Sequence, residues 1–114
     1  MNQFRQFSIV EMLNYMVKRP GAFFGRKDYT FAQAIAFLDG YAVAQNVFGD
    51  RDERFYGVKV KSELVKRYGA EYELKMPMHI LDMFDAVCDN EEDKLRLLAE
   101  IVNTLDDKQE LFLK

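Results

Sequence analysis

Two side chains of this 114-residue chain belong to types that often perform chemistry: its single histidine, His79, and its single cysteine, Cys88. An imidazole can act as a general base near neutral pH, and the spacing allows His79 a contact with Asp82. A thiol reacts as the thiolate, and the acids around Cys88 are expected to raise its pKa. One His and one Cys cannot form a zinc site alone, and one Cys cannot form an internal disulfide. We therefore expect no catalytic residue, no metal and no cofactor, in a protein that is not an enzyme.

An acidic run points to binding instead. Six carboxylates occur within 12 residues with no Lys or Arg among them: Asp82, Asp85, Asp89, Glu91, Glu92 and Asp93. The i, i+3, i+7 spacing of the first three places them on one helix face, and the others would begin the next helix. The run lacks the glycine of an EF-hand calcium loop. Two interpretations stay open: a solvated helix corner, or a docking surface for a basic partner, whose approach it would accelerate.

The distribution of charge excludes several classes of function. The chain has 16 Lys and Arg against 19 Asp and Glu, a net charge of −3. Residues 1–81 carry 12 basic and 9 acidic residues (+3), whereas residues 82–114 carry 4 and 10 (−6). A net-acidic chain without a basic tract is a poor nucleic-acid binder. No stretch approaches the roughly 18 apolar residues of a membrane span, and no signal peptide is visible, so we expect a cytoplasmic protein with no membrane partner.

The elements that must position these residues are helices. Apolar residues recur at helical spacing over about 8–19, 31–48, 50–69, 77–88 and 91–105, and the tail 106–114 could add a turn. Ser8 with Glu11 predicts a capping box, Pro77 is expected to open the fourth helix, and Asp89 or Asn90 to cap the fifth. Residues 70–75 are expected to be an extended connector. The prediction is an all-α fold, a single compact domain of five to six helices over residues 1–114.

The helix over residues 31–48 is expected to lie at the centre of that domain, because apolar residues surround it nearly completely. Asp39 interrupts this apolar surface and must find partners, since an unpaired buried charge is costly. We expect it to accept backbone N–H groups of the loop between Gly21 and Gly25, or to pair with Arg19 or Arg26. Close backbone packing would explain Gly40. The residues interpreted as structural are Gly21, Gly25, Asp39, Gly40 and Tyr41.

Short motifs in the first half of the chain resemble a group of small bacterial proteins. The motifs are Lys18-Arg19-Pro20-Gly21, Phe24-Gly25 and Ala36-Phe37-Leu38-Asp39-Gly40-Tyr41. Several proteins of that group look like immunity proteins of polymorphic or contact-dependent growth inhibition toxin systems. The resemblance implies a small, non-catalytic protein that forms a 1:1 complex with its cognate toxin domain. That toxin domain would be a basic protein with nuclease activity. The acidic residues would steer docking, with Tyr68, Tyr72 or Phe112 as aromatic anchors.

Other functions compete with this interpretation. The chain could be a helical adaptor or an oligomeric structural subunit whose Phe- and Met-rich segments extend the core across an interface. An enzyme would need a pocket around His79. A helix-turn-helix would use the basic residues Lys59, Lys61, Lys66 and Arg67, but nearby glutamates weaken that interpretation.

Overall fold

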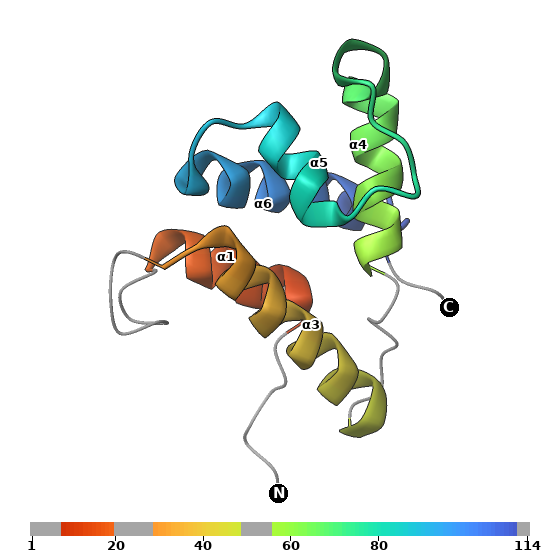
Figure 1. Ribbon diagram of the computed structural model, residues 1–114. Coiled ribbons are helices and arrows are strands. Elements are labelled where there is room, and N and C mark those ends of the chain that lie inside the picture. Colours follow the sequence, from red (N-terminus) through yellow and green to blue (C-terminus); the bar gives the residue numbers. More distant parts are fainter. Residues whose placement is uncertain (1–7, 20–28, 49–55, 112–114) are drawn as a thin grey trace, which may run out of the picture.

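The computed structural model describes residues 8–19, 29–48 and 56–111, without the side chains of Asn46 and Phe48. Within these ranges the chain forms helices α1 (Ile9–Lys18), α3 (Phe31–Phe48), α4 (Tyr56–Tyr72), α5 (Ile80–Val87) and α6 (Glu91–Asp107), and no strand (Figure 1). The predicted all-α class is therefore confirmed. No helix in the described part of the chain has the length and apolar character needed to cross a membrane.

Local capping explains where the first two helices begin. The Ser8 hydroxyl accepts the Glu11 N–H at 3.2 Å, and the Glu11 carboxylate accepts the Ser8 N–H at 3.2 Å, as the predicted capping box requires. Thr30 and Gln33 form the same reciprocal pair at the start of α3, at 3.2 and 2.7 Å. Each pair satisfies N–H groups that the first helical turn leaves without a partner.

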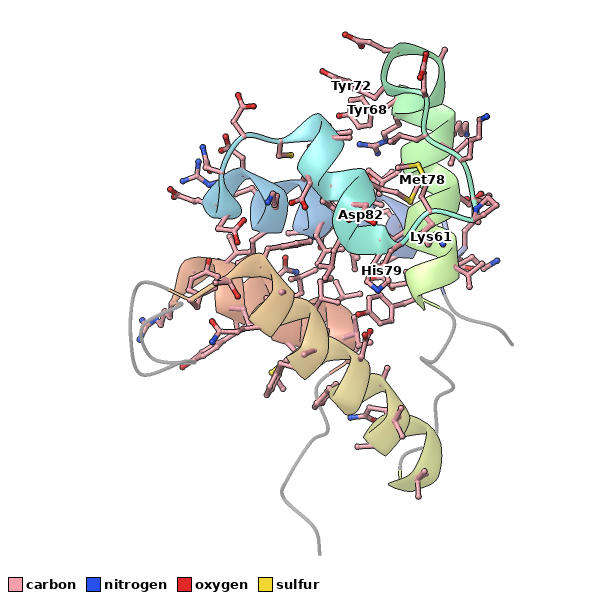
Figure 2. The ribbon with its side chains drawn as sticks, in the orientation of Figure 1. Lys61, Tyr68, Tyr72, Met78, His79 and Asp82 are labelled. Atoms are coloured by element: carbon pink, nitrogen blue, oxygen red, sulfur yellow. The ribbon has the colours of Figure 1, made fainter. Side chains whose placement is uncertain are left out.

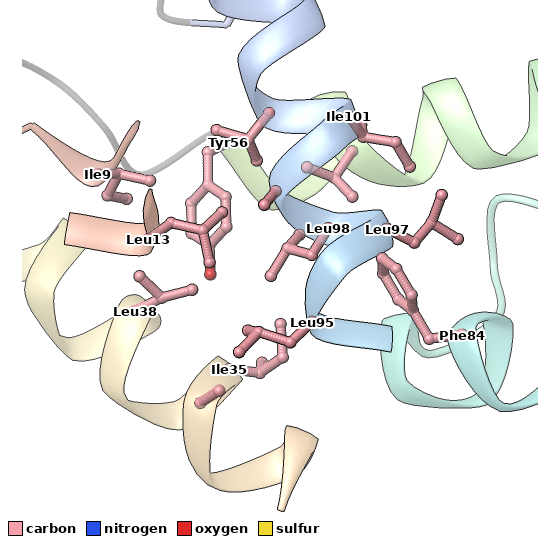
Figure 3. Packing of buried hydrophobic residues seen from close by; sticks show 14 of the residues in the cluster. Ile9, Leu13, Ile35, Leu38, Tyr56, Phe84, Leu95, Leu97, Leu98 and Ile101 are labelled. Carbon is pink, nitrogen blue, oxygen red and sulfur yellow. The ribbon is translucent and has the colours of Figure 1, made fainter. Parts of the chain in front are cut away.

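The core is centred on α6, not on α3. The apolar side of α6 packs against α1, α3 and α4. Figure 3 shows Leu95 and Leu98 pointing toward α1 and α3, while Leu97 lies beside Phe84 of α5. The prediction that the helix over 31–48 is central was therefore wrong. Its apolar residues lie on both sides, but only one side meets the core.

The ends of α4 and α5 differ from the sequence expectation. Residues 70–72 are helical rather than extended, and α4 ends at Tyr72, directly before Glu73, whose φ of 56° is left-handed. The Leu74 N–H then donates to the Gly69 carbonyl at 3.2 Å and the Leu74 side chain is buried, a helix stop fixed by a hydrophobic contact. The expected start of this helix at Asp50 or Asp52 lies outside the described residues. Pro77 does not open α5, which begins at Ile80.

Side-chain hydrogen bonds connect α1 to α6 and α3 to α4. Asn14 of α1 and Asn103 of α6 exchange reciprocal amide hydrogen bonds of 3.0 and 2.8 Å. The Tyr56 hydroxyl at the start of α4 donates to the Asp39 carboxylate of α3 at 2.8 Å. Because each pair joins two different helices, with partners 89 and 17 residues apart, the pairs fix how the helices pack as well as adding stability.

Candidate protein-binding surface

Five of the six predicted carboxylates lie in the second half of α5, in the turn that follows and in the first turn of α6, whereas Asp82 lies in the first turn of α5. We call the six together the acidic corner: Asp82, Asp85, Asp89, Glu91, Glu92 and Asp93. The first two lie on α5, Asp89 lies in the connecting turn, and the other three form the first turn of α6. The prediction that Asp82, Asp85 and Asp89 share one helix face is wrong for Asp89, because α5 ends at Val87.

The turn between the two helices is held by caps. The Cys88 N–H donates to the Phe84 carbonyl at 2.9 Å, and Cys88 itself has extended backbone angles, which ends α5. The Asn90 side chain then accepts the Asp93 N–H at 2.8 Å and donates to the Asp93 carboxylate at 3.0 Å. This confirms Asn90, one of the two residues predicted to cap the last helix. The carboxylates are therefore presented from a defined backbone.

Two cationic side chains just after the six carboxylates neutralise part of their negative charge. Lys94 pairs with Asp85 and, at 2.8 Å, with Glu91, while Arg96 pairs with Glu92 at 2.5 Å. Six carboxylates and two cations leave the segment 82–96 at −4. Glu91 also accepts the Phe31 N–H at 3.3 Å and so joins α6 to the start of α3, a structural role.

The free negative charge of the corner is carried by three exposed residues. Asp82, Asp89 and Asp93 form no ion pair with any Lys or Arg of the described ranges, and all three are exposed. Burial raises the pKa of the Cys88 thiol, and the nearby charges of Asp93 and Asp89 raise it further, although Lys94 opposes them. The same negative environment raises the pKa of Lys94, mainly through its hydrogen bonds to Asp85 and Glu91. The corner is thus a region of negative potential.

The two residues that could have performed chemistry have structural positions. The Nδ1 atom of His79 accepts the Leu81 N–H at 3.1 Å, so His79 is the N-cap of α5. Cys88 is half-buried and packs against the core. No three His, Cys, Asp or Glu side chains are arranged to hold a metal ion in the part of the chain that the structure describes.

Aromatic and apolar side chains lie at the C-terminal end of α4 and in the loop that follows it. The rings of Tyr68 and Tyr72 meet edge to face with centroids 6.1 Å apart, and Met76 is 40% exposed. In Figure 2, Tyr68 and Tyr72 lie at one end of this region, with Met78 and Asp82 further along. Sequence reasoning named the tyrosines as anchors but missed Met76, which no periodicity marks because it follows the helix end.

Of the residues interpreted as structural, Asp39, Gly40 and Tyr41 lie within the described ranges. Asp39 accepts the Tyr56 hydroxyl, whereas Gly21, Gly25 and Arg26 lie outside the described residues. Gly40 is exposed, and a Cβ atom there would meet nothing within 4 Å, so close packing within the described fold does not explain it. The Tyr41 hydroxyl accepts the Gln45 amide at 2.8 Å, which is a structural contact.

The described surface therefore offers exposed carboxylates along α5 and the start of α6 and, separately, exposed Tyr72 at the end of α4 with Met76 in the loop that follows. Comparisons of this chain with protein-family models, with curated proteins and with solved structures found no match. The resemblance to immunity proteins accordingly stays a prediction that rests on the motifs alone.

Proposed function

We propose that this chain is a non-catalytic immunity protein that binds a basic toxin domain, with the acidic corner as its docking surface. The observation that carries the proposal is that Asp82, Asp89 and Asp93 are exposed and have no ion pair within the described ranges, in a segment of net charge −4. A nuclease toxin presents positive charge because its substrate is a polyanion. A negative surface on the inhibitor attracts the same site and competes with nucleic acid for it.

The exposure of each side chain indicates whether it would affect the association rate or the residence time of the complex. Exposed charges at the rim of an interface mainly raise the association rate, because they attract the partner before contact. Residence time depends on apolar side chains that become buried in the complex. Tyr72 and Met76, 38% and 40% exposed, can supply such area at the C-terminal end of α4 and in the loop that follows it. The proposal therefore assigns steering to the carboxylates and anchoring to the α4 end.

A kinetic experiment tests this function. The toxin domain encoded beside this chain is expected to be neutralised at 1:1 stoichiometry. A triple variant, Asp82→Asn with Asp89→Asn and Asp93→Asn, should lower the association rate constant about tenfold at low salt and flatten its salt dependence. Stopped-flow mixing at several NaCl concentrations measures both.

A matched control removes the same charge elsewhere. Asp106→Asn with Asp107→Asn and Glu110→Gln also deletes three exposed carboxylates, at the far end of α6. This control should keep the association rate of the parent chain. An unchanged rate in the corner variant, or an equal loss in both variants, would show that the corner is not the docking surface.

A further inference from the structure

Helix α3 has two faces, and both are apolar. Its buried face packs on the core through Phe31, Ala34, Ile35, Leu38 and Ala42. The opposite face exposes Val43 and Val47, 55% and 60% accessible, together with Ala36, Gly40 and Ala44. We call these five exposed residues the α3 face. In Figure 1, the C-terminal half of α3 extends away from α4, α5 and α6.

The α3 face is unlike the outer face of an ordinary surface helix. Surface helices place charged and polar residues outward, whereas helices that are apolar all round are covered on both sides. The only charged residue of α3 is Asp39, which lies at the edge of this face and accepts the Tyr56 hydroxyl. A continuous uncharged apolar surface of this kind marks a protein–protein contact.

Gly40 indicates what kind of partner the face fits. A glycine inside a helix is less favourable than alanine, so it needs a compensating reason. A Cβ atom at Gly40 would meet nothing within 4 Å, which means that the described fold has room for a side chain at this position. Close approach of a second helix backbone does require glycine here, because a side chain at a crossing point holds two helices apart.

The order of side-chain sizes identifies the second helix. Ala36 and Ala44 lie four residues on either side of Gly40, and Phe37 and Val43 lie three residues on either side. A two-fold axis at Gly40 would place Ala36 at the level of Ala44 of an antiparallel copy and Phe37 at the level of its Val43, small beside small and large beside large around the crossing point, while Val47 would lie at the level of Gln33 near the ends. Such self-complementarity is the signature of an isologous contact.

We propose that two copies of this chain pair through the α3 face, as antiparallel helices that cross at Gly40. The absence of charge on the face agrees with this occupant, because identical copies would otherwise repel each other. A basic toxin, by contrast, would find no carboxylate at the centre of the face. The pairing thus uses a different surface from the acidic corner and does not depend on the proposed function.

The size of the contact sets its strength. A helix of 18 residues is about 27 Å long and about 10 Å wide. One such crossing lies at the small end of specific interfaces, so we expect a dissociation constant on the order of 10–100 μM. Sedimentation equilibrium between about 5 μM and 1 mM protein covers this range.

The decisive variant is Gly40→Leu. It adds apolar surface in open space, so the monomer should keep its helix content, and its unfolding temperature should not fall and should rise slightly, because leucine favours a helix more than glycine does. If two helices cross closely at Gly40, the added leucine should weaken the dimer at least tenfold. If the chains associate only because their surfaces are apolar, the same substitution should strengthen the dimer. Val43→Glu should weaken the dimer to the same extent as Gly40→Leu. Its control is Val58→Glu on α4, since Val58 is equally exposed at 55%, and this control should dimerise like the parent chain.

Cysteine crosslinking tests the orientation. In a Cys88→Ser background, an equimolar mixture of Ala36→Cys and Ala44→Cys chains should form a disulfide-linked dimer at least fivefold faster than either chain alone. Faster crosslinking of each chain with itself would indicate parallel helices and overturn the antiparallel pairing. A parent chain that stays monomeric at 1 mM, or a Gly40→Leu variant that dimerises as well as the parent, would overturn the proposal altogether.

Discussion

The thiol of Cys88 reports on the potential of the acidic corner. Its pKa is raised first by burial and then by the charges of Asp93 and Asp89, while Lys94 acts in the opposite direction. A raised pKa keeps the sulfur as the less reactive thiol at neutral pH. This agrees with the expectation from the sequence that acidic neighbours make Cys88 unreactive.

Alkylation of Cys88 measures that potential directly. Asp89→Asn with Asp93→Asn should speed the reaction with iodoacetamide at pH 7.5 several-fold, because removing two negative charges lowers the pKa of the thiol. Mass spectrometry of quenched samples gives the rate. Asp106→Asn with Asp107→Asn should leave the rate as it is. A corner variant that reacts no faster would mean that burial alone controls the thiol.

At the scale of elements, the Asn14–Asn103 pair fixes α1 against α6. Each amide donates to the other, and Asn103 also donates to the Ala99 carbonyl at 2.7 Å. Both residues are half-buried, so the loss of one partner leaves the other amide poorly satisfied.

A double-mutant cycle isolates this contact. Asn14→Ala or Asn103→Ala should each lower the free energy of unfolding by about 1–2 kcal/mol. The double variant should lose about 0.5–1.5 kcal/mol less than the sum, because the second substitution removes a partner that is already lost. The better helix propensity of alanine cancels in the cycle. Urea unfolding gives all four values, and strict additivity would contradict a coupled pair.

Elements whose ends depend on neighbouring residues were predictable from the sequence. The side chains of Ser8 and Asn90 accept N–H groups three residues further along the chain, so a short stretch of sequence is enough to predict these caps. The start of α5 was misplaced because Pro77 and His79 are both acceptable near a helix start, and the acceptor position of His79 depends on its backbone angles. The ending of α4 depends on burial of Leu74, which the sequence does not reveal.

Contacts between distant segments were not predictable. Apolar residues on both sides of α3 could not show which side meets the core, because that depends on where α6 packs. The acidic corner was predicted by composition, yet its free carboxylates depend on which side chains Lys94 and Arg96 reach. The Tyr56 partner of Asp39 lies 17 residues away on another helix, where no helical spacing would reveal it.

Across the whole molecule, every pKa shift among the described groups is upward. The pKa of the Tyr56 hydroxyl is raised, mainly by burial and then by the charge and hydrogen bond of Asp39. Burial is also the main cause for Cys88, whereas hydrogen bonds to Asp85 and Glu91 are the main cause for Lys94. In each case the folded chain holds its proton to a higher pH than the unfolded chain does. These groups therefore contribute stability that is complete at low pH and is lost as the pH rises.

Alkaline unfolding tests this for the molecule as a whole. The free energy of unfolding should begin to fall above about pH 8.5, where an unfolded cysteine ionises, and fall more steeply above about pH 10, where tyrosine and lysine ionise. Tyr56→Phe should lower stability at pH 7 by about 1–3 kcal/mol, because it loses a hydrogen bond to a carboxylate. It should also flatten the decline above pH 10, since the variant has no proton to release there. Urea unfolding of both chains between pH 6 and 11 measures this, and parallel curves would show that the Tyr56–Asp39 contact does not carry the alkaline dependence.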